Sequence, residues 1–366
     1  MSCSHAIYTV KSVVSYYCNN NSTVNLCALD LSRAFDTVNY SMLFMKLMDR
    51  NLPRNIIVLL SRWYQCSTAT VKWNRCESFS VPLSAGVRQG GILSPHLFAV
   101  FVDDLLIKLS TSSLGCRYRG LIYNALMYAD DLLLLSISIH DLQKMVDICY
   151  NFFNSIGLTI NIAKSACLRI GSLHNVPVAD IVVNNTSLSW KCEIKYLGVT
   201  FVKSSTVKCN LQSARHKFFK AVNGIFGKIG TKANVNVLLS LMRAYCNPVL
   251  TYGLNVINLT KSMYNEIESA YSSAFSKIFQ TFDKGTIAQC QYYCGALPAS
   301  YLIDCQKINF LLKLDKCSSL PLAVIFQTSS IKELTVLFDK YSLPAYTGYS
   351  VKRALFSHFE NCVINL

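Results

Sequence analysis

The sequence predicts an α+β fold in which an antiparallel sheet carries helices on one face and is followed by a helical region. Two observations lead to this prediction. Short apolar runs and helical spacings are mixed through the first 204 residues, and residues 125–136 have the pattern of an antiparallel hairpin. Beyond Ser204 the strand signals fade and helical spacings dominate. With 366 residues, 52% of them hydrophobic, the chain can form two or three structural units.

The first elements place one aspartate at the end of a strand. Residues 4–18 have helical spacing and run into the polar stretch CNNNST. Residues 23–32, TVNLCALDLS, alternate apolar and polar side chains, which predicts a strand that delivers Asp30 at its C-terminal end. Residues 39–53 look helical and end at Pro53.

Two pairs of adjacent aspartates follow. A glycine-rich turn at 86–91 leads into a helix that begins near Pro95 and carries Asp103 and Asp104. The stretch ALMYADDLLLLS places Asp130 and Asp131 between two apolar runs, which predicts a hairpin with both carboxylates at its tip. The second pair is therefore the catalytic candidate.

The remaining segments complete the predicted order of elements. A helix over 142–156 is expected to stop at Gly157, and residues 158–171 are expected to form a strand. Residues 211–230, 235–246 and 262–280 are expected to form successive helices, and residues 301–314 a further one.

Composition narrows the classes of partner. Lysine and arginine outnumber acidic residues 35 to 20, and the formal charge of +15 favours nucleic acid first and an acidic membrane surface second. The 16 cysteines are scattered and the N-terminus is no signal peptide, so we expect reduced, intracellular cysteines. The sequence contains no run of eighteen or more uncharged apolar residues, so no membrane span is predicted. The mean hydropathy of +0.31 predicts apolar surface that packs on another domain or partner.

The aspartates suggest a metal-dependent reaction. Carboxylate oxygens from neighbouring strands are hard ligands of the kind that Mg²⁺ prefers, with water and substrate phosphates completing its coordination. Two such ions can activate an attacking hydroxyl and stabilise a leaving pyrophosphate.

Five segments resemble the conserved motifs of non-LTR (LINE-type) retrotransposon reverse transcriptases. These are LDLSRAFDTV, GVRQGGILSPHLF, MYADD, GLTINIAKS and YLGVTF, in that order. The resemblance implies a right-hand polymerase, with partial fingers and palm in 1–204, a helical thumb-like region in 205–285, and a helical region of unknown role in 286–366. It also implies an RNA template, a DNA primer, dNTP substrates and two Mg²⁺ ions, for which Mn²⁺ can substitute.

The same resemblance assigns roles to the acidic residues and to one lysine. Asp30 and Asp130 would bind both metals, Asp131 would add negative charge beside them, and Leu31 would offer its backbone carbonyl. Lys164 would protonate the leaving pyrophosphate, and an ordinary surface lysine is the alternative.

Other matched positions would contact the substrates. Phe35 would lie under the incoming sugar and exclude a 2′-hydroxyl, or would be a core aromatic residue. Gln89 and Gly90 would lie against the nascent base pair, or would form only a tight turn. The matched segment Tyr196, Leu197 and Gly198 would hold the primer end, and strand packing is the alternative.

The chain also departs from the family pattern. The family has a longer fingers region upstream and commonly an endonuclease domain, so we expect that such segments are missing from this chain. Loss of triphosphate contacts would reduce turnover. The alternative hypothesis is therefore a weak or inactive retrotransposon remnant that only binds nucleic acid. The expected location is intracellular, with entry into the nucleus during integration, and no membrane partner is expected.

Overall fold

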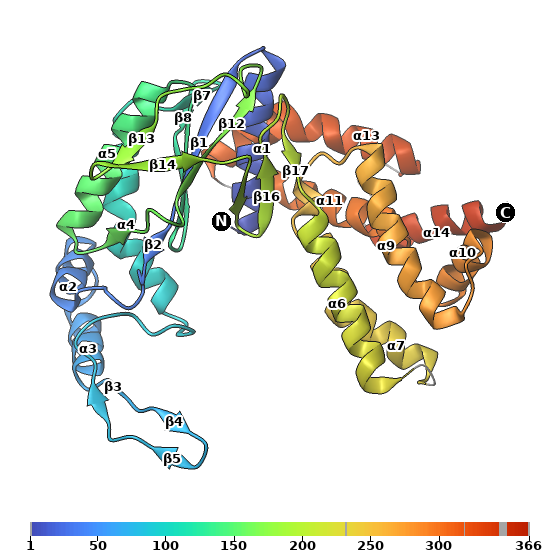
Figure 1. Cartoon of the computed structure of the whole chain (residues 1–366), viewed down its shortest axis with the longest axis horizontal. Helices are drawn as coiled ribbons and strands as arrows, with labels where there is room; N and C mark the ends of the chain where they lie inside the picture. Colours follow the sequence, from blue (N-terminus) through green and yellow to red (C-terminus); the bar gives the residue numbers. More distant parts are fainter. Residues whose placement is uncertain (1, 231–232, 318, 344–349, 365–366) are drawn as a thin grey trace. The chain divides into compact units, whose positions relative to one another are not determined.

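The computed structural model describes residues 2–230, 233–317, 319–343 and 350–364 (Figure 1). The chain divides into two compact units. The sheet unit comprises Tyr16–Tyr196 and Lys203–Thr206, and the helical unit comprises the residues up to Ser15, Leu197–Val202 and the chain from Val207 onward. The domain boundaries expected near residues 204 and 285 stay predictions.

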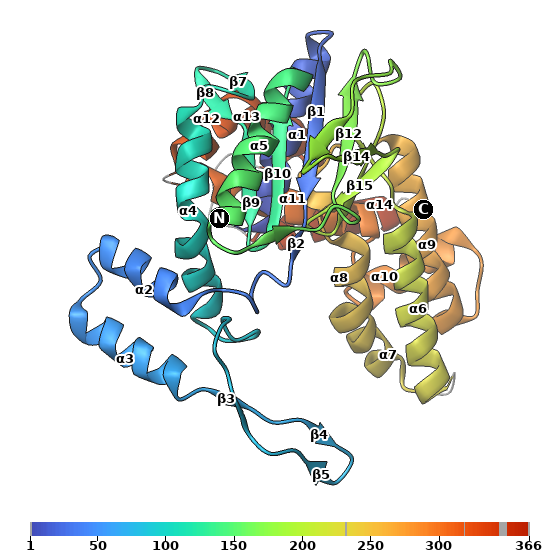
Figure 2. The ribbon, with the colours of Figure 1, turned by 60° about the vertical axis from the view of Figure 1, so that its left-hand side comes forward.

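A six-stranded sheet forms the centre of the sheet unit (Figure 2). Its strands, in spatial order, are β13 (Ile181–Val183), β14 (Thr186–Trp190), β12 (Ala166–Gly171), β1 (Thr23–Leu29), β10 (Asp131–Ser136) and β9 (Ala125–Tyr128). All neighbouring pairs are antiparallel except β12 and β14, which are parallel. The predicted α+β class is thus confirmed, with one parallel pair added to the sheet.

The strand predicted over residues 158–171 is wrong as a single element. It divides into β11 (Thr159–Ile160), which pairs with β2 (Leu31–Ser32), and β12. Between them Asn161 forms a turn, because its carbonyl accepts from the Ser165 hydroxyl and its side chain accepts from the Lys164 amide. The turn changes the direction of the chain just before β12.

Strand β1 is buried on both faces, although apolar and polar side chains alternate along it. Asn25 is 1% exposed and Cys27 is fully buried. Asn25 can stay inside because its amide donates to the carbonyls of Ser136 and Ile137 and its Oδ1 accepts from Arg169 Nε. These hydrogen bonds offset the cost of burying a polar group.

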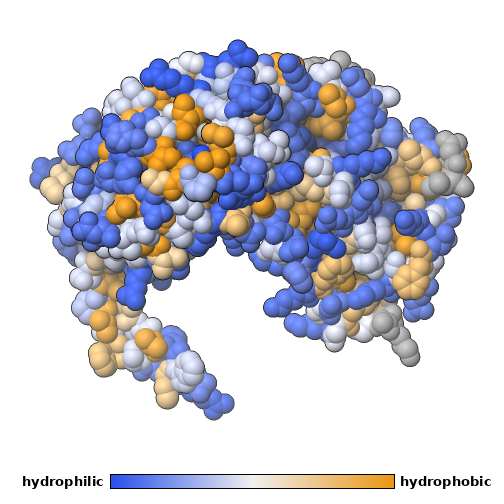
Figure 3. Space-filling view, turned by 45° about the horizontal axis from the view of Figure 1, so that its top comes forward, coloured by the Kyte–Doolittle hydropathy of each residue, from blue (hydrophilic) through white to orange (hydrophobic). Residues whose placement is uncertain are grey.

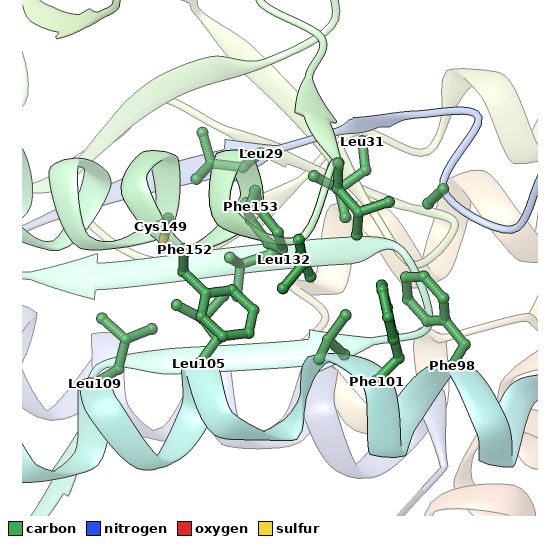
Figure 4. Packing of buried hydrophobic residues seen from close by; sticks show 14 of the residues in the cluster. Leu29, Leu31, Phe98, Phe101, Leu105, Leu109, Leu132, Cys149, Phe152 and Phe153 are labelled. Atoms are coloured by element: carbon green, nitrogen blue, oxygen red, sulfur yellow. The ribbon is translucent and has the colours of Figure 1, made fainter. Parts of the chain in front are cut away.

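Helices α4 (Ser94–Thr111) and α5 (Ile139–Ser155) pack together beside β9 and β10 and form the main core of this unit (Figure 4). Phe101 and Leu105 of α4 and Phe153 of α5 are almost fully buried. Helix α5 begins at the Ser138 cap and ends before Gly157, whose φ of +75° suits glycine. The predicted stop at Gly157 is confirmed.

The helix predicted over residues 39–53 is too long. Helix α2 (Tyr40–Asp49) ends four residues before Pro53, and a second helix, α3 (Arg54–Gln65), begins after this proline. Asn51 has a φ of +56°, which interrupts the helix before the proline is reached. Helix α3 was not predicted.

An extended hairpin, which we call the arm (residues 66–83), follows α3 (Figures 1 and 2). It contains β3 (Thr68–Ala69), β4 (Lys72–Trp73), β5 (Cys76–Glu77) and β6 (Val81–Pro82), all of whose residues are exposed. Trp73 is 77% exposed and Phe79 is 84% exposed, and Figure 3 shows the arm as a projection with hydrophobic and hydrophilic residues mixed on it. The arm has no core of its own.

The remaining strands of this unit are β7 (Cys116–Tyr118), β8 (Leu121–Tyr123) and β15 (Glu193–Tyr196).

The helical unit contains a short strand pair and a series of helices. The strands are β16 (Val199–Val202) and β17 (Lys208–Cys209). The helices are α6 (Gln212–Ile229), α7 (Val235–Leu241), α8 (Asn247–Thr251), α9 (Lys261–Phe279), α10 (Lys284–Tyr293), α11 (Ala299–Asp315), α12 (Leu320–Ile325), α13 (Ile331–Tyr341) and α14 (Val351–Ile364). Short π-helical segments at Met242–Cys246 and Phe326–Ser330 and a 3₁₀ turn at Leu254–Val256 connect some of them. Helix α1 (Cys3–Asn19) begins the chain. The helices predicted in this region are confirmed.

Buried ionic groups occur between helices of the helical unit. Asp304 of α11 is fully buried and accepts hydrogen bonds from Tyr264, Lys340 and Tyr341. Glu333 forms ion pairs with Lys11 and with Lys307. Burial lowers the pKa of Lys11 to about 8, against the opposing effect of the Glu333 charge.

One helical stretch, Leu320–Tyr341, is long and apolar enough to cross a membrane, and 33% of its most apolar window is buried in the protein. A core helix of a soluble protein passes the same test, so a single stretch is weak support for a span. Glu333 lies within this stretch and would be costly in a bilayer. The absence of a membrane partner stays a prediction.

Candidate active site

Two of the predicted aspartates lie opposite each other on adjacent strands. The antiparallel register of β1 and β10 places Leu29 opposite Leu132. Asp30 follows Leu29 and Asp131 precedes Leu132, so the same register brings these two aspartates face to face. Directly paired residues have Cα atoms about 4.5–5.5 Å apart. The structure thus brings together two residues, Asp30 and Asp131, that are 101 positions apart in the sequence.

Asp130 occupies the turn next to this pair. Tyr128 and Asp131 pair across the β9–β10 hairpin, which leaves only Ala129 and Asp130 as the connecting residues. Ala129 takes a φ of +53°, as tight hairpin turns require. The predicted hairpin with an acidic tip is confirmed.

The carboxylates repel one another. The pKa of Asp131 is raised, first by partial burial and then by the charges of Asp130 and Asp30, while Lys195 opposes the shift. Negative charge therefore accumulates at this end of the sheet, and a cation bound there would relieve the repulsion.

Lys164 is the basic residue that the structure places at Asp30. Its Nζ lies 3.9 Å from Asp30 Oδ2, and its side chain is 71% exposed. The turn that carries Lys164 is tied to Asp30 by two hydrogen bonds: the Asp30 amide donates to Ser165 Oγ at 3.0 Å, and the Asp30 carbonyl accepts from the Asn161 amide at 2.8 Å. The sequence analysis did not single out Asn161 and Ser165. The available signal was Asn161 itself, a turn-forming residue three positions before Lys164.

The carboxylates offer donors that suit a divalent cation. Within the described ranges, no three His, Cys, Asp or Glu side chains lie close enough to enclose a metal ion by themselves. Mg²⁺ does not need such a cage, because it is usually held by one or two carboxylates together with substrate phosphates and water. The hard oxygens of Asp30, Asp130 and Asp131 fit this requirement. The Leu31 side chain is a buried hydrocarbon without a ligand atom, so only the backbone carbonyl of Leu31 could take part.

Phe35 lies against the helix that follows the glycine-rich turn. Its ring stacks on Phe98 of α4 with a centroid distance of 4.7 Å and an interplanar angle of 21°. Phe35 remains half-buried, so it serves the core and still presents part of its ring outward. The stacking on Phe98 supports the interpretation of Phe35 as a core aromatic residue. Its role under the sugar of an incoming nucleotide stays a prediction.

The glycine-rich turn is attached to the segment around Phe35. The Val87 amide donates to the Phe35 carbonyl at 2.7 Å, and Gln89 Nε2 donates to Asp36 Oδ1 at 3.2 Å. At Gly86, with φ +94°, a Cβ atom would lie 2.8 Å from the Asp36 carbonyl oxygen, so a larger residue would push the two segments apart. Sequence reasoning missed the partners Gly86 and Asp36.

Gly90 needs glycine for a different reason. Its φ is +81°, and nothing lies within 4 Å of the position that a Cβ atom would take. Gln89 and Gly90 are both exposed, which leaves them accessible to a ligand.

The three residues of the predicted primer segment lie at the end of β15. Tyr196 is 2% exposed and its hydroxyl donates to the Leu126 carbonyl of β9 at 3.1 Å. Leu197 and Gly198 have φ values of +45° and +83° and form the turn into β16. A Cβ atom on Gly198 would lie 2.7 Å from Tyr252 Cε1 within the helical unit. The turn is thus closely fitted, and its role toward a primer stays a prediction.

The other aspartate pair has a structural role. Asp103 Oδ2 lies 2.7 Å from Arg50 Nη2, and Asp104 Oδ2 lies 2.6 Å from Lys46 Nζ. The hydrogen bond from Lys46 lowers the pKa of Asp104, and the Arg50 charge adds to this effect. Both aspartates lie on α4 as predicted, and they join this helix to α2.

This combination of an antiparallel sheet, a paired set of strand-end aspartates and a glycine-rich turn defines a polymerase-type palm. Residues 2–201 match the family described as reverse transcriptase (RNA-dependent DNA polymerase), and the chain belongs to that family.

The similar curated proteins come from non-LTR retrotransposons. The chain is 29% identical over 193 residues to the Pol polyprotein of the type-2 retrotransposable element R2DM of Drosophila melanogaster, covering 50% of this chain and 18% of that protein. It is 24% identical over 262 residues to the RNA-directed DNA polymerase of the mobile element jockey of Drosophila funebris, covering 69% of this chain and 28% of that protein. The chain therefore spans much less than half the length of these relatives.

Solved structures with a similar chain path include a telomerase from Candida albicans in complex with the TWJ fragment of telomeric RNA. The sequence identity is 12% and the TM-score is 0.44, over 98% of this chain and 54% of that chain. An apo telomerase from Candida tropicalis gives the same TM-score at 12% identity, over 97% of this chain and 56% of that chain.

Proposed function

We propose that this chain carries the polymerase site of a non-LTR retrotransposon reverse transcriptase, which adds deoxynucleotides to a DNA primer 3′-hydroxyl on an RNA template. The observation that supports this proposal best is that Asp30 and Asp131 both adjoin the Leu29–Leu132 pair of β1 and β10, with Asp130 in the adjoining turn. Membership of the reverse transcriptase family supports the same reaction. The net charge of +15 suits a polyanionic template and primer.

In this proposal the carboxylates hold two divalent ions, Mg²⁺ or in its place Mn²⁺. When bound, the ions would supply charge that favours ionisation of the primer hydroxyl and stabilises the leaving pyrophosphate. Asp30 and Asp130 would hold both ions, the Leu31 carbonyl would add a backbone oxygen, and Asp131 would contribute negative charge beside them. The mutual repulsion seen at Asp131 is consistent with a site that gains stability when cations bind.

Lys164 would act on the leaving group. Its ammonium is mostly exposed, so it can turn from Asp30 toward a bound triphosphate. There it would donate a proton to the pyrophosphate oxygen as the bond to the α-phosphorus breaks. The Asp30 carboxylate attracts this ammonium and holds it near the site.

The segments around this centre would orient the substrates. Phe35 would lie under the incoming sugar, where its ring leaves no room for a 2′-hydroxyl. Gln89 and Gly90 would lie against the nascent base pair, with Gln89 positioned by Asp36. Tyr196, Leu197 and Gly198 would hold the primer end. Such a protein would work inside the cell and enter the nucleus for integration.

Primer extension on an RNA template, with a DNA primer, dNTPs and Mg²⁺, tests the proposal. We expect Asp30→Asn and Asp130→Asn each to lower the extension rate by about a hundredfold or more, as the loss of a group that stabilises transition-state charge does. Asp103→Asn is the matched control, because it removes the same charge from an adjacent-aspartate pair on α4. Extension that survives both active-site changes would reject the proposal.

The same experiment separates the alternative function. Salt-sensitive binding of an RNA–DNA hybrid without any extension, at high protein concentration and with Mg²⁺ or Mn²⁺ present, would identify the chain as a nucleic-acid-binding remnant. Extension by the wild-type chain would exclude that alternative.

A further inference from the structure

A second charged site lies on the sheet unit, away from the aspartates. A cavity of about 260 Å³ is formed by the exit of β12, the loop that follows it, the end of β14 and the segment at Lys203. Its lining includes Arg169, His174, Trp190, Lys191 and Lys203. No function described above uses any of these residues.

The position of Arg169 separates this cavity from the catalytic candidate. Arg169 pairs with Asn25 across β12 and β1, whereas Asp30 lies beyond the other end of β1. Five residues of extended strand correspond to roughly 17 Å, so Arg169 lies well away from the aspartates along the sheet. Trp190 and Lys191 lie beside Cys167 of β12 and line the side of the cavity that is nearer to the aspartates.

The cavity is lined by cations without an acidic neighbour. No Asp or Glu is among its lining residues, and in the described part of the chain no carboxylate lies within 4 Å of Arg169, Lys191 or Lys203. Asp180 and Glu193 are near in sequence but do not line it. The positive charges of Arg169, Lys191 and Lys203 repel one another, and a bound anion would relieve that repulsion.

Burial of Arg169 makes the unpaired positive charge of the cavity costly. Arg169 is 9% exposed, and its hydrogen bonds go to neutral acceptors, the Asn25 side chain and the Val176 carbonyl. Buried charges are normally paired with an opposite charge. Its guanidinium has five N–H donors, more than these two acceptors use.

The other lining residues suit the same kind of ligand. Lys191 is exposed and Lys203 is half-buried, so both ammonium groups can reach an anion in the cavity. His174 donates from Nδ1 to the Gly171 carbonyl at 2.9 Å, so Nε2 of the neutral ring is an acceptor and the anion would depend on Arg169 and the two lysines. Trp190 is half-buried and offers part of an aromatic face beside these cations.

From these observations we propose that the cavity is a phosphate-binding site, in which Arg169, Lys191 and Lys203 bind one phosphate group. The volume suits a phosphate or one nucleotide, since pockets for larger organic ligands usually start at about 300 Å³. The phosphate belongs either to a free anion or nucleotide, or to the backbone of a nucleic acid that reaches this end of the sheet. The site is independent of the polymerase reaction and does not require it.

The test uses the full chain and charge-neutral variants of the two accessible lysines. Arg169 is unsuitable because its loss would leave Asn25 Oδ1 and the Val176 carbonyl without the donor that Arg169 provides. Lys191→Gln, Lys203→Gln and the double variant are compared with Lys144→Gln, which removes the same charge from an exposed position on α5. Circular dichroism checks that each variant is folded. The probes are inorganic phosphate, AMP and a single-stranded oligonucleotide, titrated at constant ionic strength without divalent metal.

We expect each lysine change to weaken binding of the accepted probe by about tenfold, as loss of a charge-assisted hydrogen bond does, and Lys144→Gln to leave it unchanged. If phosphate and AMP depend on the lysines, the ligand is a free phosphate or nucleotide. If only the oligonucleotide depends on them, the ligand is a backbone phosphate, and the salt dependence of binding decreases by about one ion per lost contact. Equal binding by wild type and the double variant with all three probes, or an equal loss in Lys144→Gln, overturns the proposal.

Discussion

The buried carboxylate of Asp304 gives a stability prediction for the helical unit. Asp304 is fully buried and accepts from the hydroxyl of Tyr264 at 2.7 Å, the hydroxyl of Tyr341 at 2.8 Å and the ammonium of Lys340 at 2.6 Å. Burial first, and then the Asp304 charge, raises the pKa of both tyrosines, so their hydroxyls stay protonated and keep donating. All the groups around this carboxylate are therefore donors.

Asp304→Asn keeps the shape of the side chain and removes the charge. An amide has only one oxygen acceptor, so its NH₂ group must face at least one donor. Hydrogen bonds to charged groups contribute about 1.5–3 kcal/mol each, and breaking a buried ionic group costs about 3–5 kcal/mol. Lys340 is 48% exposed, so its ion pair is screened and counts for less. We expect a loss of about 3 kcal/mol in the free energy of unfolding.

Urea unfolding followed by circular dichroism at the helical band measures this loss. At an m-value of about 2 kcal/mol per molar urea, the midpoint of the affected transition should fall by about 1–2 M. Asp339→Asn is the matched control, because Asp339 is exposed on the same helix as Lys340. If the midpoint of Asp304→Asn falls no further than that of Asp339→Asn, the hydrogen-bonded carboxylate does not stabilise the unit and the reasoning is refuted.

Three further predictions concern the candidate active site and its surroundings. Because the pKa of Asp131 is raised in the metal-free chain, protons should compete with Mn²⁺ for this carboxylate at a higher pH than they would for an ordinary carboxyl, so the affinity for Mn²⁺ should begin to fall at a higher pH. Lys195→Gln removes a charge that opposes the shift and should move this fall further up the pH scale, and an unmoved or lowered pH dependence of Mn²⁺ binding would contradict the assignment. Phe35→Val should reduce the preference for dNTPs over rNTPs in competition assays. Unchanged selectivity would reject the role at the sugar and leave only the packing of Phe35 against Phe98. Gly198→Ala should lower the free energy of unfolding, measured with urea, by about 1–3 kcal/mol, because Gly198 has a φ of +83° and the new Cβ atom would meet Tyr252. A loss below about 0.5 kcal/mol would show that the turn relaxes to accept the alanine.

The central sheet could be predicted because its signals are local. The apolar runs on both sides of Asp130 predict a hairpin, and the helical spacing through Asp103 and Asp104 predicts that this pair lies on a helix. Both expectations are confirmed by β9, β10 and α4. What local patterns could not show is that β1 is buried on both faces, since the polar Asn25 depends on Arg169, which is 144 positions away.

The arm and α3 were missed for different reasons. The buried residues Ile57 and Leu60 of α3 recur at helical spacing, so this helix could have been predicted from the sequence. The arm could not, because none of its strand residues is buried and its sequence therefore carries no alternation between a core side and a solvent side. At the site, the link between Asp30 and the Lys164 turn was also missed, because its two hydrogen bonds, one to the Ser165 hydroxyl and one from the Asn161 amide, join residues more than 130 positions apart.

The tryptophans of this chain give a consequence for spectroscopy. The chain has 3 tryptophans, and all of them lie in the sheet unit: Trp63 on α3, Trp73 on the arm and Trp190 at the cationic cavity. Trp63 and Trp73 are largely exposed, so the emission of the free protein should be red-shifted and readily quenched by iodide. Any ligand or partner that covers the arm should shift this emission to the blue. Unfolding of the helical unit, which has no tryptophan, should leave the emission largely unchanged, so one label-free signal distinguishes events in the two units.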